Sequence, residues 1–234
     1  MIIAIPRETT IGENRVAVTP EQVKKYSEWG FQVKIETSAG TASGFDDDDY
    51  LKAGAEIAPD AAQTYQNADI ILKIWAPLPD EDRLLKPGQT IIANFQALAH
   101  PARVAELAKQ GLTCFALDML PRISRAQSMD ILSSQSNLAG YKAVINAVNL
   151  LPRAIPLMMT AAGTVSPAKV LVLGAGVAGL QAIATAKRLG AQVFASDVRP
   201  QVKEQVESLG ARFLEVKTSE TFELSLIHIS EPTR

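Results

Sequence analysis

Three glycines and one carboxylate in the second half of the chain have the spacing of a dinucleotide site. Gly174, Gly176 and Gly179 form a G-x-G-x-x-G pattern, and Asp197 follows Gly179 by 18 residues. The first glycine of such a pattern permits a tight turn, the second lets the backbone approach a pyrophosphate, and the third allows a helix to pack closely on a strand. A carboxylate at this distance can accept hydrogen bonds from the adenosine ribose hydroxyls and repels a 2′-phosphate. These four residues predict an NAD(H) site.

The elements around this pattern are those that such a site needs. An apolar run at 169–173 predicts a strand before the glycines, 180–189 predicts a helix after them, and 192–196 predicts a second strand that ends just before the acid. A glycine-rich turn without a ligand is therefore disfavoured. Arg199 complicates the choice of cofactor, because a nearby arginine can pair with a 2′-phosphate. With Asp197 at the ribose position we favour NAD(H), and we expect Arg199 to lie over the adenine or in a solvent-exposed ion pair.

A second candidate is the polar segment from Pro121 to Ser136, which follows an apolar run at 112–117 that predicts a buried strand. In doubly wound sheets, ligands bind beyond the carboxyl ends of the strands. The segment offers a guanidinium, an amide, a carboxylate and a hydroxyl that could position a nicotinamide amide and ribose, on Arg122, Gln127, Asp130 and Ser133. A polar surface loop with local helix caps remains an equal alternative.

The positions of apolar residues predict the fold that carries these segments. Strands are predicted at 2–5, 31–36, 69–74, 90–95, 112–117 and 212–216, with helices at 20–29 and 101–110 between them. Alternating strands and helices are typical of a parallel sheet with helices on both faces. We therefore predict an α/β protein with two doubly wound parallel-sheet domains, the second a Rossmann NAD-binding domain that is incomplete in this chain.

Four segments are predicted along the chain. Residues 1–136 form an N-terminal, flavodoxin-like α/β domain; 137–152 a connecting helix capped by Asn137; 153–224 a partial Rossmann domain that begins with a loop at 160–167; and 225–234 a non-native tail. The tail resembles translated sequencing-adapter read-through, so no functional role is expected for its His228.

Composition excludes several classes of function. The formal net charge is −2, which excludes a strong basic surface for nucleic acid. No stretch reaches the roughly 20 apolar residues of a membrane span. The single cysteine, Cys114, lies in an apolar run and predicts a buried thiol in a reducing compartment. The acidic run Asp46–Asp49 is typical of the start of a helix rather than of a metal site, and we predict no metal site.

Several stretches of the chain resemble one enzyme family. They are Ile5–Glu8, Glu13–Ala17, Ala68–Lys73, Pro121–Ser136 and Lys169–Pro200. With these, the chain resembles the NAD(H)-binding first domain of the proton-translocating nicotinamide nucleotide transhydrogenase alpha subunit, which shares a superfamily with alanine dehydrogenase. The resemblance implies that the nicotinamide end is held by Arg122, Gln127, Ser128, Met129, Asp130 and Ser133. It implies that the pyrophosphate and adenosine are held by Gly174, Gly176, Val177, Gly179, Asp197, Val198 and Arg199.

The resemblance also implies an activity. Hydride would pass directly from NADH to NADP⁺, with NADP(H) bound by the partner beta subunit, so that catalysis is mainly positioning and exclusion of water. The family couples this reaction to proton translocation. It implies a homodimer of NAD-binding domains as a peripheral part of a membrane complex, at the cytoplasmic face of the inner membrane. The later Rossmann half and the family's mobile loop with its tyrosine are not in this sequence, so we expect the chain to be a part of a longer protein.

Two alternatives stay open. Arg15 and Lys73 match the residues that hold pyruvate in alanine dehydrogenases, but those enzymes carry a histidine where this chain has Gln96. Without that imidazole, imine reduction loses its proton carrier. The nearby His100 lies at a predicted helix start, where we expect a capping or surface role. The second alternative is an NAD-binding module with no chemistry of its own.

Overall fold

The computed structural model describes residues 1–121 and 123–215. The chain divides into two compact units, each with hydrophobic clusters of its own: unit 1, Met1–Pro121, and unit 2, which begins at Arg122. The predictions for Arg122 itself, for residues 216–224 and for the tail at 225–234 lie outside the described residues.

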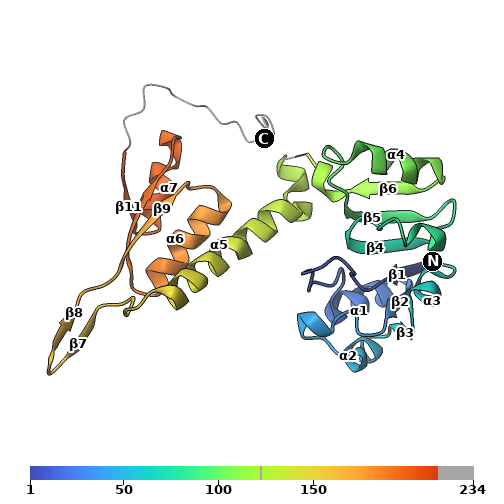
Figure 1. The fold of residues 1–234 in the computed structure, drawn as a ribbon, viewed down its shortest axis with the longest axis horizontal. Coiled ribbons are helices and arrows are strands. Elements are labelled where there is room, and N and C mark those ends of the chain that lie inside the picture. Colours follow the sequence, from blue (N-terminus) through green and yellow to red (C-terminus); the bar gives the residue numbers. More distant parts are fainter. Residues whose placement is uncertain (122, 216–234) are drawn as a thin grey trace. The chain divides into compact units, whose positions relative to one another are not determined.

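Unit 1 contains a parallel sheet of six strands (Figure 1). The strands are β1 (Ile2–Ile5), β2 (Gln32–Glu36), β3 (Glu56–Ala58), β4 (Ile70–Trp75), β5 (Thr90–Asn94) and β6 (Thr113–Ala116). Their order is β3-β2-β1-β4-β5-β6. The order reverses between β1 and β4, where Ile3 is opposite Ile70, and this is the switch point at which doubly wound sheets bind ligands.

The predicted flavodoxin-like order needs a correction. The observed order is the six-stranded 3-2-1-4-5-6 type rather than the five-stranded 2-1-3-4-5 type. The difference is the short strand β3, which the sequence pattern missed because Glu56, Ile57 and Ala58 form too short a run to alternate clearly. Without β3, the remaining strands would have the flavodoxin-like order.

The helices of unit 1 begin where the sequence predicts. They are α1 (Pro20–Glu28), α2 (Asp47–Lys52), α3 (Ala61–Tyr65) and α4 (Pro101–Lys109), with short 3-10 turns η1 (Thr41–Ser43), η2 (Asp82–Leu84) and η3 (Leu117–Met119). Asp46 and Asp49 form a capping box at the start of α2, which confirms the helix-start interpretation of the acidic run. Strand β6 is not the buried strand that was predicted, because it lies at the sheet edge and its Phe115 is 56% exposed.

Unit 2 contains the first half of a second doubly wound sheet. Its elements are η4 (Ser124–Met129), α5 (Ile131–Leu150), β7 (Met158–Thr160), β8 (Gly163–Val165), β9 (Lys169–Leu173), α6 (Val177–Arg188), β10 (Gln192–Ser196), η5 (Pro200–Val202), α7 (Lys203–Ser208) and β11 (Arg212–Phe213). The three parallel strands have the order β11-β10-β9, the 3-2-1 half of a Rossmann sheet.

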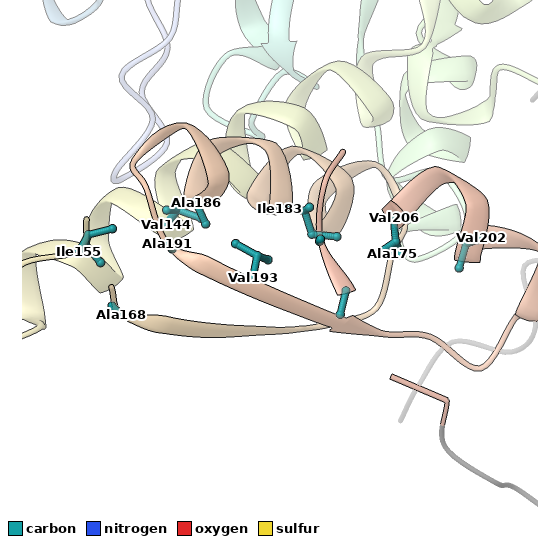
Figure 2. Close-up of a cluster of buried hydrophobic side chains, with 12 residues drawn as sticks. Val144, Ile155, Ala168, Ala175, Ile183, Ala186, Ala191, Val193, Val202 and Val206 are labelled. Carbon is teal, nitrogen blue, oxygen red and sulfur yellow. The ribbon is translucent and has the colours of Figure 1, made fainter. Parts of the chain in front are cut away.

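One hydrophobic core holds unit 2 together. Helices α5 and α6 lie on one face of the sheet, and small aliphatic side chains fill the space between them and the strands (Figure 2). Buried members from the helices and strands include Val144, Ile183, Val193 and Ala195. Many of them are alanine or valine, which lets the helices approach the sheet closely.

Two predictions for unit 2 were wrong in detail. The long helix begins at Ile131 rather than after Asn137, because Asp130 is its N-cap. It belongs to the same compact unit as the Rossmann strands. The segment at 160–167 is not a simple loop, since β7 and β8 form an antiparallel hairpin that extends away from the rest of unit 2 (Figure 1). Among the described helices, none is long and apolar enough to cross a membrane.

Candidate functional site

The three glycines occupy the roles that their spacing predicts. Gly174 has φ +91°, a left-handed conformation that favours glycine, and its N–H donates to the Ser196 carbonyl at 2.8 Å. Gly176 is the N-cap of α6, and the space where a Cβ would project is open. A Cβ on Gly179 would lie 1.9 Å from the Gly174 carbonyl oxygen. The turn can therefore exist only with glycine at 179, and it leaves an open approach to the backbone at 176.

Asp197 joins the end of β10 to this turn. Its Oδ2 accepts the Ala175 N–H at 2.7 Å, and its side chain is 6% exposed. Burial alone would raise the pKa of Asp197, but hydrogen bonds from the Arg199 side chain and from the Ala175 and Arg199 N–H groups outweigh it and lower the pKa to about 2. The carboxylate is therefore fixed and ionised beside the glycine turn.

The structure brings Arg199 onto Asp197. The Arg199 guanidinium donates through Nε to Oδ1 at 3.0 Å and through Nη2 to Oδ2 at 3.1 Å. The predicted ion pair is thus present, but it is not solvent-exposed, since the Arg199 side chain is 21% exposed. Val177 and Val198, the two apolar residues predicted to flank the dinucleotide, are both exposed at 43% and 47%.

The polar segment forms a 3-10 turn followed directly by helix α5. Asp130 Oδ1 accepts the Ser133 N–H at 3.0 Å, and the Ser133 hydroxyl donates to Oδ2 at 2.6 Å. This is an N-cap for α5. Gln127, Ser128 and Met129 are exposed on the turn before it. The structure therefore brings Asp130 and Ser133 together and leaves the other three side chains accessible.

Helix α5 sets where this turn lies relative to the glycines. A Cβ on Gly140 would lie 2.1 Å from the Ala178 carbonyl oxygen, so α5 touches α6 in its first turn. Further along, Ala147 and Leu151 line a groove with Ala186 and Leu189 near the end of α6. The two helices therefore run in the same direction.

The start of α5 consequently projects beyond the start of α6. At 1.5 Å per residue, the nine residues between Ile131 and Gly140 extend about 14 Å past the contact with Ala178. Because α6 begins beyond the carboxyl end of β9, this projection carries Asp130 and Ser133 to the ligand side of the sheet. One overlooked signal for this arrangement is present in the sequence, namely Gly140 in the middle of a long helix.

Strand β9 forms an edge of the described sheet. Its Leu171 and Leu173 are 55% and 78% exposed, and beside it lies an apolar groove of about 450 Å³ between α5 and β9. In the doubly wound order, a fourth strand pairs with the first at this position. The described part of unit 2 thus has the features of the incomplete Rossmann domain that was predicted.

In unit 1, the two residues that could hold pyruvate are paired with carboxylates of the chain. Lys73 Nζ lies 2.9 Å from Glu81 Oε1 and 3.7 Å from Glu8 Oε2, and its side chain is 1% exposed. Arg15 Nη2 lies 2.6 Å from Glu13 Oε2. These contacts match the structural ion-pair role that was the alternative for both cations.

The position of the missing histidine is also occupied by a polar side chain. Gln96 follows β5 with φ +47°, and its Oε1 lies 3.2 Å from His100 Nε2. His100 is exposed at the start of α4, as predicted. Cys114, on β6, is partly buried rather than fully buried, and burial raises the pKa of its thiol.

Comparisons with known proteins agree with this architecture. Residues 4–139 match the family described as alanine dehydrogenase/PNT, N-terminal domain, and residues 143–229 match its C-terminal domain. The chain is 54% identical over 231 residues to the first of the separate chains that form the NAD(P) transhydrogenase alpha subunit of Rhodospirillum rubrum, covering 94% of this chain and 60% of the relative.

Two solved structures extend the comparison. A transhydrogenase from Sinorhizobium meliloti matches with a TM-score of 0.89 and 50% identity, over 94% of this chain and 63% of that one. An L-alanine dehydrogenase matches with a TM-score of 0.82 and 30% identity, over 93% and 61%. The chain thus spans about 60% of the length of these relatives and is more similar to the transhydrogenases than to the dehydrogenase. With both of its domains matched, the chain belongs to the alanine dehydrogenase/PNT family.

Proposed function

We propose that this chain is the NAD(H)-binding part of a proton-translocating transhydrogenase. It holds NADH for direct hydride transfer to NADP⁺ on a beta subunit. The observation that carries the proposal is the pairing of the glycine turn with a second polar element on the ligand side of the same sheet. Similarity supports it, since identity is 54% to a transhydrogenase alpha subunit and 30% to an alanine dehydrogenase.

The roles of the residues follow from their positions. Gly174, Gly176 and Gly179 shape a turn whose open backbone at the start of α6 suits a pyrophosphate. Asp197 accepts from the adenosine ribose, while Val177 and Val198 supply apolar contact. The exposed turn at Gln127, Ser128 and Met129, with Arg122 before it and the Asp130–Ser133 cap behind it, orients the nicotinamide end.

No acid or base is needed for a direct hydride transfer, so the residues act by positioning. A helix cap fixes a loop more firmly than an unsupported turn does, and a misplacement of about 1 Å can cost on the order of 100-fold in rate. The short hydrogen bonds between Asp130 and Ser133 therefore suit a role in holding the turn still. Coupling to proton movement belongs to other parts of the complex, and this chain would lie at the cytoplasmic face of the inner membrane.

We further propose that the chain pairs with a second copy through the β7–β8 hairpin. All six hairpin residues are exposed, and the apolar ones include Met158 and Met159 at 47% and 76%. An isolated two-stranded hairpin is only marginally stable in water, so this one needs a surface to cover it. Sedimentation velocity should find a dimer for the parent and a shift to monomer for Met159→Asp; a monomeric parent would contradict the proposal.

Dinucleotide titration tests the NAD(H) assignment. The chain should enhance NADH fluorescence at lower concentrations than it enhances NADPH fluorescence, because Asp197 faces the ribose. With pyruvate, ammonium and NADH it should produce no alanine, since Lys73 and Arg15 are paired internally and Gln96 replaces the proton carrier. Alanine formation at ordinary enzyme rates would support the dehydrogenase alternative instead.

A further inference from the structure

The carboxylate that should receive the ribose is already saturated by the chain itself. A carboxylate has about four lone-pair positions. Oδ1 of Asp197 accepts the Arg199 N–H at 2.8 Å and Arg199 Nε at 3.0 Å. Oδ2 accepts the Ala175 N–H at 2.7 Å and Arg199 Nη2 at 3.1 Å. Each oxygen therefore has one backbone donor and one guanidinium donor.

We propose that Arg199 is a specificity-determining residue that competes with the adenosine ribose for Asp197, and that it weakens discrimination between NADH and NADPH. This inference rests on the proposed NAD(H) site. The backbone donors hold the glycine turn and remain in place, whereas the guanidinium is the exchangeable partner. Its departure frees one position on each oxygen, which equals the two hydroxyls that a ribose presents.

The competition has a consequence for the second cofactor. A free carboxylate repels a 2′-phosphate, but a carboxylate neutralised by a two-point guanidinium contact repels it less. An arginine displaced from Asp197 remains tethered two residues away and can pair with an added phosphate, because guanidinium groups bind phosphate through two parallel hydrogen bonds. Arg199 thus has the effect of opposing Asp197 in cofactor choice.

Substitution of Arg199 separates this role from a simple adenosine contact. Arg199→Gln should leave NADH binding within about threefold or strengthen it, and should weaken NADPH binding by about tenfold, the equivalent of roughly 1.4 kcal/mol. Arg199→Lys keeps the charge and loses the two-point contact, so its ratio of NADPH to NADH dissociation constants should fall between parent and Gln. The matched control is Arg188→Gln, an exposed arginine in the last turn of α6, which should leave the ratio unchanged.

The titrations use NADH and NADPH fluorescence with the full chain in low-salt buffer and in buffer at about 0.2 M salt, where the screening length is under 10 Å. A rise in the ratio for Arg199→Gln that shrinks at high salt supports the proposal, since charge repulsion is screened. An unchanged ratio, or equal weakening of both dinucleotides, would overturn it and leave the NAD(H) site intact. If the parent chain binds neither dinucleotide, the proposed function fails as well, so the two failures are distinguishable.

Discussion

Gly140 and Ala178 lie in direct contact: a Cβ built on Gly140 would come within 2.1 Å of the Ala178 carbonyl oxygen. This contact joins the helix that begins at Asp130 to the helix that begins at the glycine turn. It therefore fixes the distance between the two ends of the proposed dinucleotide site. A backbone carbonyl cannot rotate away as a side chain can, so any larger residue at 140 has to push α5 off α6.

Gly140→Ala should lower the free energy of unfolding by about 1–3 kcal/mol, the usual cost of overpacking a close contact. Thermal and urea unfolding, followed by circular dichroism, would measure it. Ala139→Ser, on the exposed side of the same helix turn, is the control and should be nearly neutral. A Gly140→Ala variant as stable as the parent would show that the helices are not this close.

Gly176→Ala and Gly179→Ala should fail in different ways. A Cβ on Gly179 would overlap the Gly174 carbonyl, so this variant should be destabilised by about 1–3 kcal/mol and should lose NADH binding. A Cβ on Gly176 meets no protein atom, so Gly176→Ala should unfold like the parent and yet bind NADH at least tenfold more weakly, because the methyl group enters the pyrophosphate space. Parent-like NADH affinity in Gly176→Ala would argue against a pyrophosphate at this turn.

The Asp130 cap separates a positional role from a structural one. Asparagine caps helices about as well as aspartate does, so Asp130→Asn should keep the stability of the parent, while Asp130→Ala should lose about 1 kcal/mol. We expect Asp130→Asn and Gln127→Asn to slow hydride transfer to NADP⁺ by about 10- to 100-fold while NADH affinity changes by roughly threefold or less. Single-turnover kinetics distinguishes the two quantities. Variants that only loosen NADH would make the loop a binding element.

Two glutamates of unit 1 should give opposite pH dependence. The hydrogen bond from Arg15 is the main cause that lowers the pKa of Glu13 from 4.5 to about 2, so its stabilising effect is full above pH 4.5 and is lost as the pH falls towards 2. Burial raises the pKa of Glu8 above 4.5, so its contribution is full below that value and is lost as the pH rises through the folded-state pKa.

Urea unfolding of Glu13→Gln and Glu8→Gln from about pH 2 to about pH 7 tests this contrast. The stability of the parent relative to Glu13→Gln should increase with rising pH, and its stability relative to Glu8→Gln should decrease. Parallel curves for both variants would contradict the paired geometry around Lys73 and Arg15.

Sequence patterns predicted the elements that are long and strongly periodic. The strands at 2–5, 169–173 and 192–196, and the helix after Thr19, were confirmed at their bounds or nearly so. Short or locally stabilised elements were missed. Strand β3 has three residues, and the cap at Asp130 depends on a side chain that reaches Ser133, which spacing alone does not distinguish from a cap at Asn137.

The candidate site shows the same limit. The glycine spacing predicted a left-handed turn at Gly174 and close packing at Gly179, since both follow from backbone sterics. The saturation of Asp197 by Arg199 was not predictable in detail, because a rotatable guanidinium two residues away has several possible partners. Packing of α5 on α6 through Gly140 depends on tertiary contact, so no local pattern could place Asp130 on the ligand side.

Deuterium transfer tests the central claim most directly. The chain would be mixed with NADH carrying deuterium at the transferred position and with the NADP⁺-loaded beta subunit of the Rhodospirillum rubrum complex, and the products analysed by mass spectrometry. Direct transfer predicts deuterated NADPH and no deuterium in water, with the yield reduced in Gln127→Asn. Absence of NADPH from a chain that demonstrably binds both NADH and the beta subunit, or loss of the deuterium to solvent, would contradict the proposal that this chain positions NADH for hydride transfer.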